Sequence, residues 1–409
     1  MVDFGALLPP SAGVWWSQAA AEPRPLVDLL LAQAGDLGPL RLFTGLSWND
    51  QLAGAISPAD TMVSYGGLGA LRELGATDQL EVVPCHYSAL PRMFAERRLP
   101  SDVGLLQVAP PDRGGMCSLG IGVDYMADAL EHTPVLIAEI NAQMPVLPGS
   151  PRVPMSRFAA TITTDRPLQE ETRRPAGEAD RVIAGHIAEL IDDGDTVQVG
   201  IGSLGAAVHG ALSEHHELGV HTGMITDGVL ALIDKGVVTG GRKQIDAGLA
   251  VAGTALGSAE LYSRLPDLPV LFRPTSYTHA PQVLSQLSSL VAVNFAIEVD
   301  LTGQVGAEMS RGTYLGAVGG QVDFARAAAL TGKRSIVALR STVRGRSSIK
   351  ARLDEGVVTT ARADVDCVVT EHGIAHLRGQ PLAERRRRLI AVAAPEFREE
   401  LSRAARAAA

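Results

Sequence analysis

The 409-residue sequence has few cysteines and few aromatic residues. Its three cysteines, Cys85, Cys117 and Cys367, are far apart, odd in number and not spaced as metal ligands. They fit a reducing cytoplasm better than a disulfide framework. Aromatic residues make up only 4% of the chain, which argues against a base-stacking surface for nucleic acid.

The sequence also lacks a surplus of positive charge and a long apolar segment. The 36 Lys and Arg against 45 Asp and Glu give a net charge of −9, so we expect no nucleic-acid partner. No run of about 18 uncharged apolar residues occurs, so we expect no membrane partner. Residues 1–16 have no basic region and contain Pro9-Pro10, unlike a signal peptide. A cytoplasmic location is therefore the expectation.

The sequence does have many apolar residues, 46%, in short runs separated by 43 glycines and 24 prolines. These runs alternate with helix-like stretches, which predicts an α/β fold. Residues 80–85, 102–109 and 134–140 are almost continuously apolar, which is typical of parallel strands covered on both faces.

Residues 145–180 are rich in Pro, Arg and Glu and show little periodicity. We interpret them as a connector between two α/β halves. The predicted domains are therefore residues 1–180, including the connector, and residues 181–409.

A glycine-rich segment, Gly200–Gly205, matches G-x-G-x-x-G between a predicted strand and a predicted helix. Asp227 follows at about the distance of a ribose-binding acid, which would suit a nicotinamide-dependent oxidoreductase. However, Asp227 begins another predicted helix, whereas the dinucleotide fold places this acid at the end of a strand. The glycines could instead let strand and helix approach closely, or bind another anion at the helix start. The motif alone does not distinguish between a dinucleotide site, a packing role and another anion site.

Residues 291–301 alternate strictly between large apolar and small or polar side chains. The alternation predicts one strand with one buried face and one open face. Glu298 falls on the open face beside the small Ala296, and Asp300 is predicted to cap the following turn. An exposed strand residue is the commoner explanation for such a glutamate. Glycine-rich segments at 316–324 and 371–375 follow, however, and acyl transfer through a carboxylate needs nearby backbone amides.

Together these segments resemble the acetyl-CoA hydrolase/transferase family, in particular 4-hydroxybutyrate CoA-transferases. The matching motifs cover nearly the full chain in the family's order, at residues 103–125, 137–145, 197–208, 218–240, 294–308, 319–328, 359–379 and 394–401. The resemblance implies two CoA-transferase-type α/β domains with mainly parallel sheets, usually in a homodimer, with the site between the domains.

The resemblance also implies the site residues. Glu298 would be the covalent nucleophile, and the Gly373 N–H would bind the oxyanion. The residues implied to contact CoA are Val369, Gly319, Gly320, and the segment Arg273, Pro274, Thr275, Ser276 and Tyr277. Arg273 is a candidate partner for the CoA phosphates. Acyl-CoA and a short-chain carboxylate would be the substrates, with no metal and no tightly bound cofactor.

Three positions depart from the family pattern. Ala317 replaces a glycine, Gly223 replaces a glutamate near the expected acid pocket, and Phe295 replaces a serine. We expect these changes to affect acyl specificity. The expected reaction is CoA transfer through a glutamyl-CoA thioester; hydrolysis of the same intermediate, an oxidoreductase and a non-catalytic CoA-binding protein are the alternatives.

Overall fold

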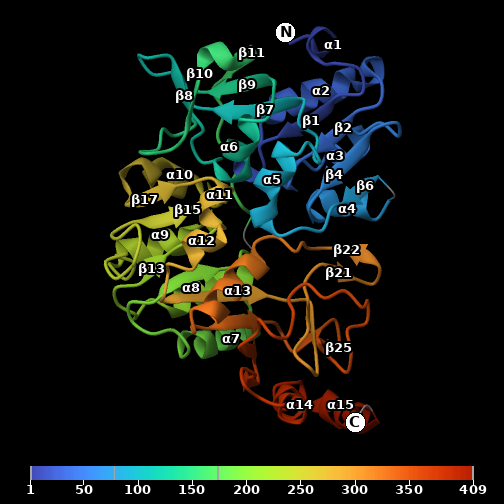
Figure 1. Cartoon of the computed structure of the whole chain (residues 1–409), viewed down its shortest axis with the longest axis vertical. Coiled ribbons are helices and arrows are strands. Elements are labelled where there is room, and N and C mark those ends of the chain that lie inside the picture. The colour runs from blue at the N-terminus through green and yellow to red at the C-terminus, as the bar shows by residue number, and fades with distance from the viewer. Residues whose placement is uncertain (1, 78, 173–174, 408–409) are drawn as a thin grey trace.

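The structure, a computed structural model, describes residues 2–77, 79–172 and 175–407. Two large β-sheets organise the chain, one in each half of the sequence (Figure 1). The first sheet has seven parallel strands in the order β11-β9-β7-β1-β2-β4-β6. These strands are β1 (Gly13–Trp16), β2 (Arg41–Phe43), β4 (Thr61–Ser64), β6 (Leu80–Val82), β7 (Val103–Val108), β9 (Val135–Asn141) and β11 (Phe158–Thr164).

Both faces of this first sheet are buried. Along β1, Val14 and Trp16 belong to one hydrophobic cluster while Trp15 belongs to another. Successive strand residues point to opposite faces, so the two clusters lie on opposite sides of the sheet. The continuously apolar runs in the sequence follow from this double burial. The helices of this half are α1 (Phe4–Leu7), α2 (Arg24–Leu37), α3 (Leu52–Ala55), α4 (Leu71–Gly75), α5 (Leu90–Ala95) and α6 (Asp124–Leu130).

The second sheet has six strands in the order β13-β12-β18-β23-β27-β28, and only β28 is antiparallel to its neighbour. These strands are β12 (Thr196–Val199), β13 (Gly219–Val220), β18 (Leu290–Phe295), β23 (Ser335–Ala338), β27 (Cys367–Thr370) and β28 (Gly373–His376). The prediction of an α/β fold with mainly parallel sheets is thus confirmed. The helices of this half are α7 (Glu178–Ala188), α8 (Ser203–Ala211), α9 (Asp227–Asp234), α10 (Ala259–Arg264), α11 (Thr275–Thr278), α12 (Pro281–Leu284), α13 (Gln321–Leu330), α14 (Leu382–Ala391) and α15 (Arg398–Ala407).

The remaining strands are short and pair with one another outside the two main sheets. They pair as β3 (Leu46–Ser47) with β5 (Leu68–Gly69), β8 (Met116–Ser118) with β10 (Arg152–Pro154), β14 (Met224–Ile225) with β16 (Thr254–Ala255), β15 (Ala250–Ala252) with β17 (Val270–Phe272), β21 (Met309–Ser310) with β22 (Thr313–Tyr314), and β24 (Thr342–Val343) with β25 (Arg346–Ser347). A three-stranded sheet joins β19 (Glu298–Asp300) to β20 (Val305–Gly306) and β26 (Ile349–Lys350). The described residues also form five short 3₁₀ turns, namely η1 (Ala19–Ala21), η2 (Tyr87–Ala89), η3 (Met155–Arg157), η4 (Leu265–Asp267) and η5 (Pro395–Phe397).

The predicted connector, residues 145–180, is more ordered than expected. Its residues 158–164 form β11, which pairs with β9 as the edge strand of the first sheet. The side chains of β11 alternate between half-buried and exposed, as befits an edge strand. The sequence pattern does not predict β11, because the apolar residues of this strand are small or separated by threonines and give no strong hydrophobic period.

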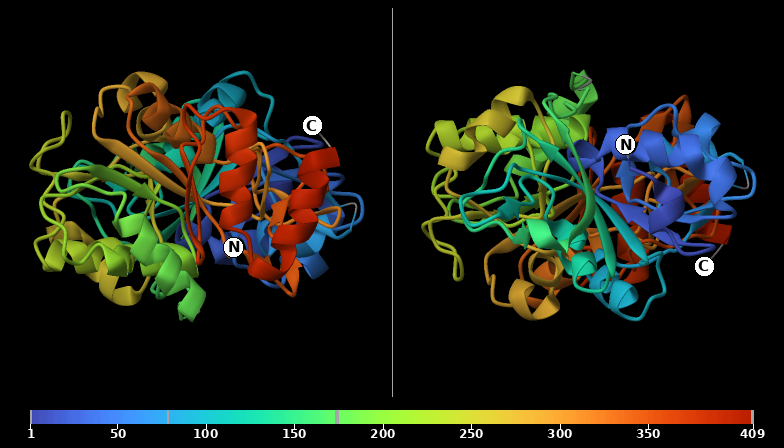
Figure 2. Two further views of the ribbon diagram at one scale, coloured as in Figure 1. Left: turned by 90° about the horizontal axis from the view of Figure 1, so that it is seen from below. Right: turned by 90° about the horizontal axis from the view of Figure 1, so that it is seen from above.

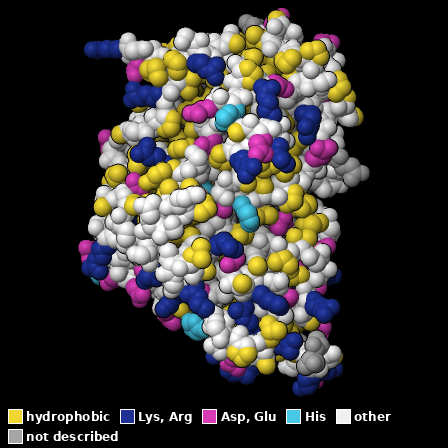
Figure 3. Space-filling model, in the orientation of Figure 1, with side chains coloured by type: hydrophobic (Ala, Val, Ile, Leu, Met, Phe, Trp, Pro, Cys, Tyr) yellow, Lys and Arg dark blue, Asp and Glu magenta, His cyan; other side chains and the backbone are white. Residues whose placement is uncertain are grey.

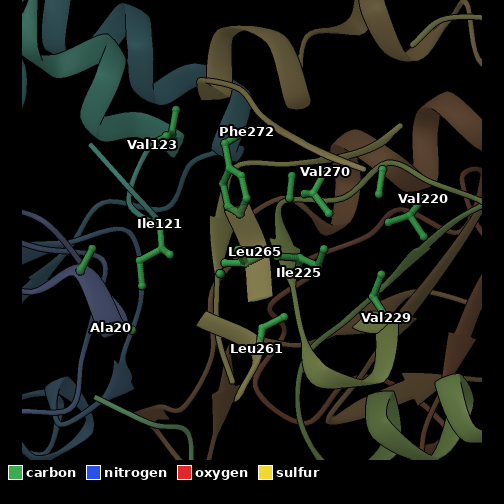
Figure 4. Packing of buried hydrophobic residues seen from close by; sticks show 14 of the residues in the cluster. Ala20, Ile121, Val123, Val220, Ile225, Val229, Leu261, Leu265, Val270 and Phe272 are labelled. Carbon is green, nitrogen blue, oxygen red and sulfur yellow. The ribbon is translucent and has the colours of Figure 1, made fainter. Parts of the chain in front are cut away.

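The two halves share one hydrophobic cluster. Ala20, Ile121 and Val123 of the first half belong to the same cluster as Ile225 and Phe272 of the second half (Figure 4). The backbone continues this contact, because the Gly253 carbonyl accepts hydrogen bonds from the N–H groups of Val123 and Asp124. Far from this contact, α14 and α15 lie side by side at the end of the molecule that carries the C-terminus (Figure 2).

Candidate active site

Glu298 lies where the chain leaves the second main sheet. The strand predicted at 291–301 is broken at Ala296 and Ile297 into β18 and β19. β18 pairs within the main parallel sheet, whereas β19 pairs with β20 and β26. Glu298 therefore lies just beyond the carboxyl end of a central parallel strand, the edge at which α/β sheets bind ligands.

The predicted open face of this strand is wrong. Ala292 and Asn294, which were expected on the open face, are 0% and 6% exposed. Ala292 packs under α13, because helices cover both faces of a parallel sheet. Phe295 and Ile297, which were expected in the core, instead line a cavity beside Glu298. The side chains do meet two environments, core and cavity, but the change occurs at the end of β18 and not between the two faces of one strand.

This cavity has a volume of about 730 Å³. Glu298 forms part of its wall and is only 7% exposed. Every residue that lines the cavity lies between Asp180 and Glu355. The Glu298 cavity is therefore built by the second half of the chain and not by both halves.

The Glu298 side chain is held on two sides. Its Oε1 accepts a hydrogen bond of 3.2 Å from the Asp354 backbone N–H. Across the strand pair, Gly306 faces Glu298, and a Cβ at Gly306 would come within 3.2 Å of the Glu298 Cγ. Glycine at 306 thus leaves the space that the carboxylate side chain occupies.

Two opposing influences act on the Glu298 carboxyl. Burial is the main cause that raises its pKa above the ordinary value, and the negative charge of Asp354 adds to it. The Lys350 ammonium acts in the opposite direction and stabilises the carboxylate. The carboxylate is therefore poorly solvated, which makes it a better nucleophile than an exposed one.

Two cations of the cavity wall are already paired. The Arg340 guanidinium donates two hydrogen bonds of 2.7 Å to the two oxygens of Asp180, and this lowers the Asp180 pKa. Lys350 pairs with Asp354. Three more arginines line the cavity, at positions 311, 344 and 346.

Val369 lies one strand, and Gly373 two strands, away from the strand β23 at the cavity wall. β27, which carries Val369, pairs with β23, whose end at Ala338 lines the cavity. Gly373 begins β28 with a φ of +127°, a backbone conformation that side chains disfavour. Between them, Glu371 accepts hydrogen bonds from the N–H and Oγ of Ser341, next to the cavity residue Arg340. Neither Gly373 nor Val369 lines the cavity itself.

The segment Arg273, Pro274, Thr275, Ser276 and Tyr277 lies elsewhere, against the first half of the chain. The Ser276 N–H donates a hydrogen bond of 3.1 Å to Asp128 of α6. Thr275 is fully buried, and the Arg273 guanidinium carbon lies 5.7 Å from the centre of the Tyr277 ring. This segment does not line the Glu298 cavity.

Gly319 and Gly320 also lie at the contact with the first half. The Gly319 carbonyl accepts a hydrogen bond of 2.9 Å from the Tyr87 N–H. A Cβ at Gly320 would stand 2.5 Å from Nε2 of His279, so only glycine fits there. The structure thus brings Glu298 together with Asp354 and Lys350, while the other predicted site residues do not line its cavity.

The three departures from the family pattern have distinct structural settings, and one of them, Phe295, lines the Glu298 cavity. The Ala317 methyl lies against Gly66, where any side chain on Gly66 would collide with it. A Cβ at Gly223 would lie 3.0 Å from the His279 ring, so histidine occupies the space beside this glycine. Burial keeps His279 neutral by lowering its pKa to about 3.

The G-x-G-x-x-G segment has a packing role. A Cβ at Gly205 would stand 2.1 Å from the Gly200 carbonyl oxygen, so α8 can meet β12 closely only with glycine there. Asp227 is the first residue of α9 and accepts hydrogen bonds from the N–H and Oγ of Ser258. These contacts favour the interpretation as a close strand–helix approach over a dinucleotide site.

Sequence reasoning missed most of the residues around Glu298. Asp354, Lys350 and Gly306 carry no motif, because they reach Glu298 only through the pairing of β19 with β20 and β26. The glycines at 312 and 345, each between short β-prone segments, are the one sequence signal for the two hairpins, because tight turns favour glycine. Within the described residues, no helix is long and apolar enough to cross a membrane, and no group of three His, Cys, Asp or Glu side chains is arranged to hold a metal.

The comparisons with known proteins agree with this architecture. The chain matches the acetyl-CoA hydrolase/transferase N-terminal domain over residues 11–160 and the C-terminal domain over residues 257–405. It is 38% identical over 338 residues to 4-hydroxybutyrate coenzyme A transferase of Clostridium kluyveri, covering 81% of this chain and 79% of that protein. It is 31% identical to butyryl-CoA:acetate CoA-transferase of Anaerostipes caccae, covering 95% and 92%.

Two solved structures share the fold at similar identity. RipA of Yersinia pestis superposes with a TM-score of 0.90 at 32% identity, covering 98% of this chain and 95% of that chain. A 4-hydroxybutyrate CoA-transferase of Porphyromonas gingivalis gives a TM-score of 0.82 at 32% identity, covering 98% and 95%. With both domains matched and relatives this similar along most of their length, the chain is an enzyme that belongs to the acetyl-CoA hydrolase/transferase family.

Proposed function

We propose that this enzyme transfers CoA between a short-chain acyl-CoA and a carboxylic acid, with the Glu298 carboxylate as the nucleophile. The observation that carries the proposal is the carboxylate itself, which is 7% exposed in the wall of the large cavity and accepts the Asp354 N–H. A carboxylate that is buried in a ligand-sized cavity and has a raised pKa fits a reacting group.

The reaction needs two displacements at carbonyl carbons. A Glu298 oxygen attacks the thioester carbonyl; the C–S bond breaks, CoA leaves as the thiolate, and an acyl-glutamyl anhydride remains. The thiolate then attacks Cδ of Glu298; the anhydride C–O bond breaks, which leaves a glutamyl-CoA thioester and the free carboxylate of the first acid. A second carboxylate reverses both steps and leaves as the new acyl-CoA.

Each step forms an oxyanion that needs hydrogen-bond donors, and losing one donor typically costs about 2.7–4 kcal/mol. The Asp354 N–H already donates to Oε1 of Glu298, so we assign it to the oxyanion that forms when CoA attacks Cδ. The Gly373 N–H is the proposed donor for the oxyanion on the acyl carbon. CoA contacts at Val369, Gly319, Gly320 and residues 273–277 stay predictions, because these residues do not line the Glu298 cavity.

The relatives indicate the substrate class. Their names include 4-hydroxybutyrate coenzyme A transferase, butyryl-CoA:acetate CoA-transferase and succinyl-CoA:acetate/propanoyl-CoA:succinate CoA transferase. We infer a short acyl group, with acetate, butyrate or 4-hydroxybutyrate as the acid. A homodimer and a cytoplasmic location remain predictions.

Hydrolysis is the second candidate, because acetyl-CoA hydrolase of Neurospora crassa is 28% identical over 59% of this chain. Water would then attack the Glu298 carbonyl in place of the acceptor acid. Incubation of the enzyme with acetyl-CoA in the presence and absence of butyrate separates the two. Transfer predicts butyryl-CoA that depends on butyrate, whereas a hydrolase releases free CoA at the same rate without butyrate. Glu298→Gln should abolish either activity; a variant with full activity would refute the nucleophile.

A further inference from the structure

We propose that two arginine-tipped hairpins bind the phosphate groups of CoA at the mouth of the Glu298 cavity. The arginine hairpins are residues 309–314, with Arg311 at the tip, and residues 342–347, with Arg344 at the tip and Arg346 beside it. The inference rests on the proposed function in one respect, namely that an acyl-CoA is the substrate.

The two hairpins have the same unusual turn. In each, an Arg-Gly pair connects strands that are otherwise fully paired, Ser310 with Thr313 and Val343 with Arg346. Both residues of each turn have positive φ: 57° and 74° in the first hairpin, 51° and 72° in the second. Positive φ at both positions of a two-residue loop is the type I′ turn.

Arginine is a poor residue for the first position of such a turn. Asparagine, aspartate and glycine are favoured there, because positive φ places Cβ close to the backbone of other residues. The same disfavoured residue at the same turn position in two hairpins is not explained by turn formation. Its side chain therefore has another role, as expected for local strain near a functional site.

The two hairpins face one cavity. Arg311, Arg344 and Arg346 all line the cavity that contains Glu298. They are exposed, as are the cavity residues Asp354 and Glu355, whereas Glu298 is 7% exposed, so the cavity has a charged, solvent-facing mouth and a buried carboxylate. In Figure 1, β21, β22 and β25 lie on the same side of the second half, and Figure 3 shows several Lys and Arg side chains, with Asp and Glu among them, over the lower half of this face.

The charges of the mouth are available to a ligand. In the described part of the chain, the arginine hairpins' three guanidinium groups make no ion pair and no side-chain hydrogen bond, unlike the cavity residues Arg340 and Lys350. Three unpaired cations in one place are notable on a chain with a net charge of −9. Guanidinium groups suit phosphate because they can donate two parallel hydrogen bonds.

CoA carries its reactive thioester and its charged phosphates at opposite ends. Its thioester must reach Glu298, while its 3′-phosphate and diphosphate lie at the other end of a long arm and remain near solvent. Arg273, the cation expected from the sequence, is less suitable: its Nε is buried without a hydrogen-bond partner, and its guanidinium lies over the Tyr277 ring. The structure therefore assigns the phosphates to the arginine hairpins.

The test uses Arg311→Asn combined with Arg344→Asn in the full-length enzyme. Asn-Gly is a preferred type I′ turn, so the double variant removes two charges while it favours both hairpins. We expect unchanged or higher stability in urea and a Kd for free CoA that rises about tenfold or more by calorimetry. Arg311→Lys with Arg344→Lys, which keeps the charge but removes the paired donors, should raise the Kd less than the asparagine variant does. Arg113→Gln, which removes an exposed arginine outside the cavity, is the matched control and should leave the Kd unchanged.

The phosphate assignment has its own readout. For 3′-dephospho-CoA, the ratio of variant to wild-type Kd should be clearly smaller than for CoA. An equal Kd for CoA in the double variant and the wild type would overturn the inference. It would also fail if the variant raised only the KM for a dicarboxylate acceptor such as succinate, because the arginines would then recognise an acid. Because binding needs no turnover, the proposed nucleophile could fail while this inference stands; a wild-type enzyme that binds no CoA would refute both.

Discussion

Gly306→Ala should slow catalysis without unfolding the enzyme. The new methyl group would lie 3.2 Å from Cγ and 3.5 Å from Oε1 of Glu298, and 3.4 Å from the Val357 carbonyl oxygen. The side chain of Glu298 must then move by a few tenths of an ångström. A misplacement of about 1 Å can cost about 100-fold in rate, so we expect a loss of about tenfold in kcat.

The stability of this variant should change little. Gly306 has no positive φ, so alanine causes no backbone strain there. Replacing glycine by alanine typically stabilises a protein by about 0.4–1 kcal/mol, because it restricts the unfolded chain. The tight contacts of the new methyl group offset this gain. The assay is the initial rate of acyl exchange together with urea unfolding. Gly35→Ala in α2, with no atom within 4 Å of the new methyl, is the control and should keep full activity. A Gly306→Ala enzyme with wild-type kcat would refute the role given to the Glu298 side chain.

Three further predictions test the site and the fold. The acid limb of the kcat/KM profile should have its midpoint above the ordinary glutamate pKa, because burial raises the Glu298 pKa, and Asp354→Asn should move that limb to lower pH. Gly205→Ala should destabilise the enzyme by about 1–3 kcal/mol in urea unfolding through its contact with a backbone carbonyl, whereas Gly210→Ala in the same helix should not. Burial raises the Glu22 pKa to about 7. The contribution of Glu22 to the free energy of unfolding is therefore full below pH 4.5 and is lost as pH rises through 7. Glu22→Gln should therefore reduce the loss of unfolding free energy between pH 5 and pH 8, by about 3 kcal/mol at most.

Much of the fold was predictable because strands that are buried on both faces are apolar at nearly every position of the sequence. The runs that became β7 and β9 are apolar at nearly every position, since each face of the parallel sheet meets a hydrophobic cluster. The resemblance to one family, carried by motifs along the whole chain, is confirmed by both matched domains. Asp300 caps its turn as expected, with its Oδ1 accepting hydrogen bonds from the Thr302 and Gln304 N–H groups.

What could not be predicted depends on contacts between distant segments. The break at Ala296 and Ile297 arises because β19 pairs with β20 and β26 rather than with the main sheet. No local pattern encodes that choice. The burial of Ala292 depends on α13, about 30 residues later, and the hydrogen bond to Glu298 comes from Asp354. Neighbours of this kind emerge only when the chain is folded.

The most direct measurement of the central claim is peptide mass spectrometry of the enzyme after incubation with acetyl-CoA. The account predicts a CoA-sized mass increase on the peptide that contains Glu298, lost on adding an acceptor acid and never formed in Glu298→Ala. An enzyme that exchanges acyl groups at full rate with no adduct on that peptide, or with the adduct on another residue, would contradict it.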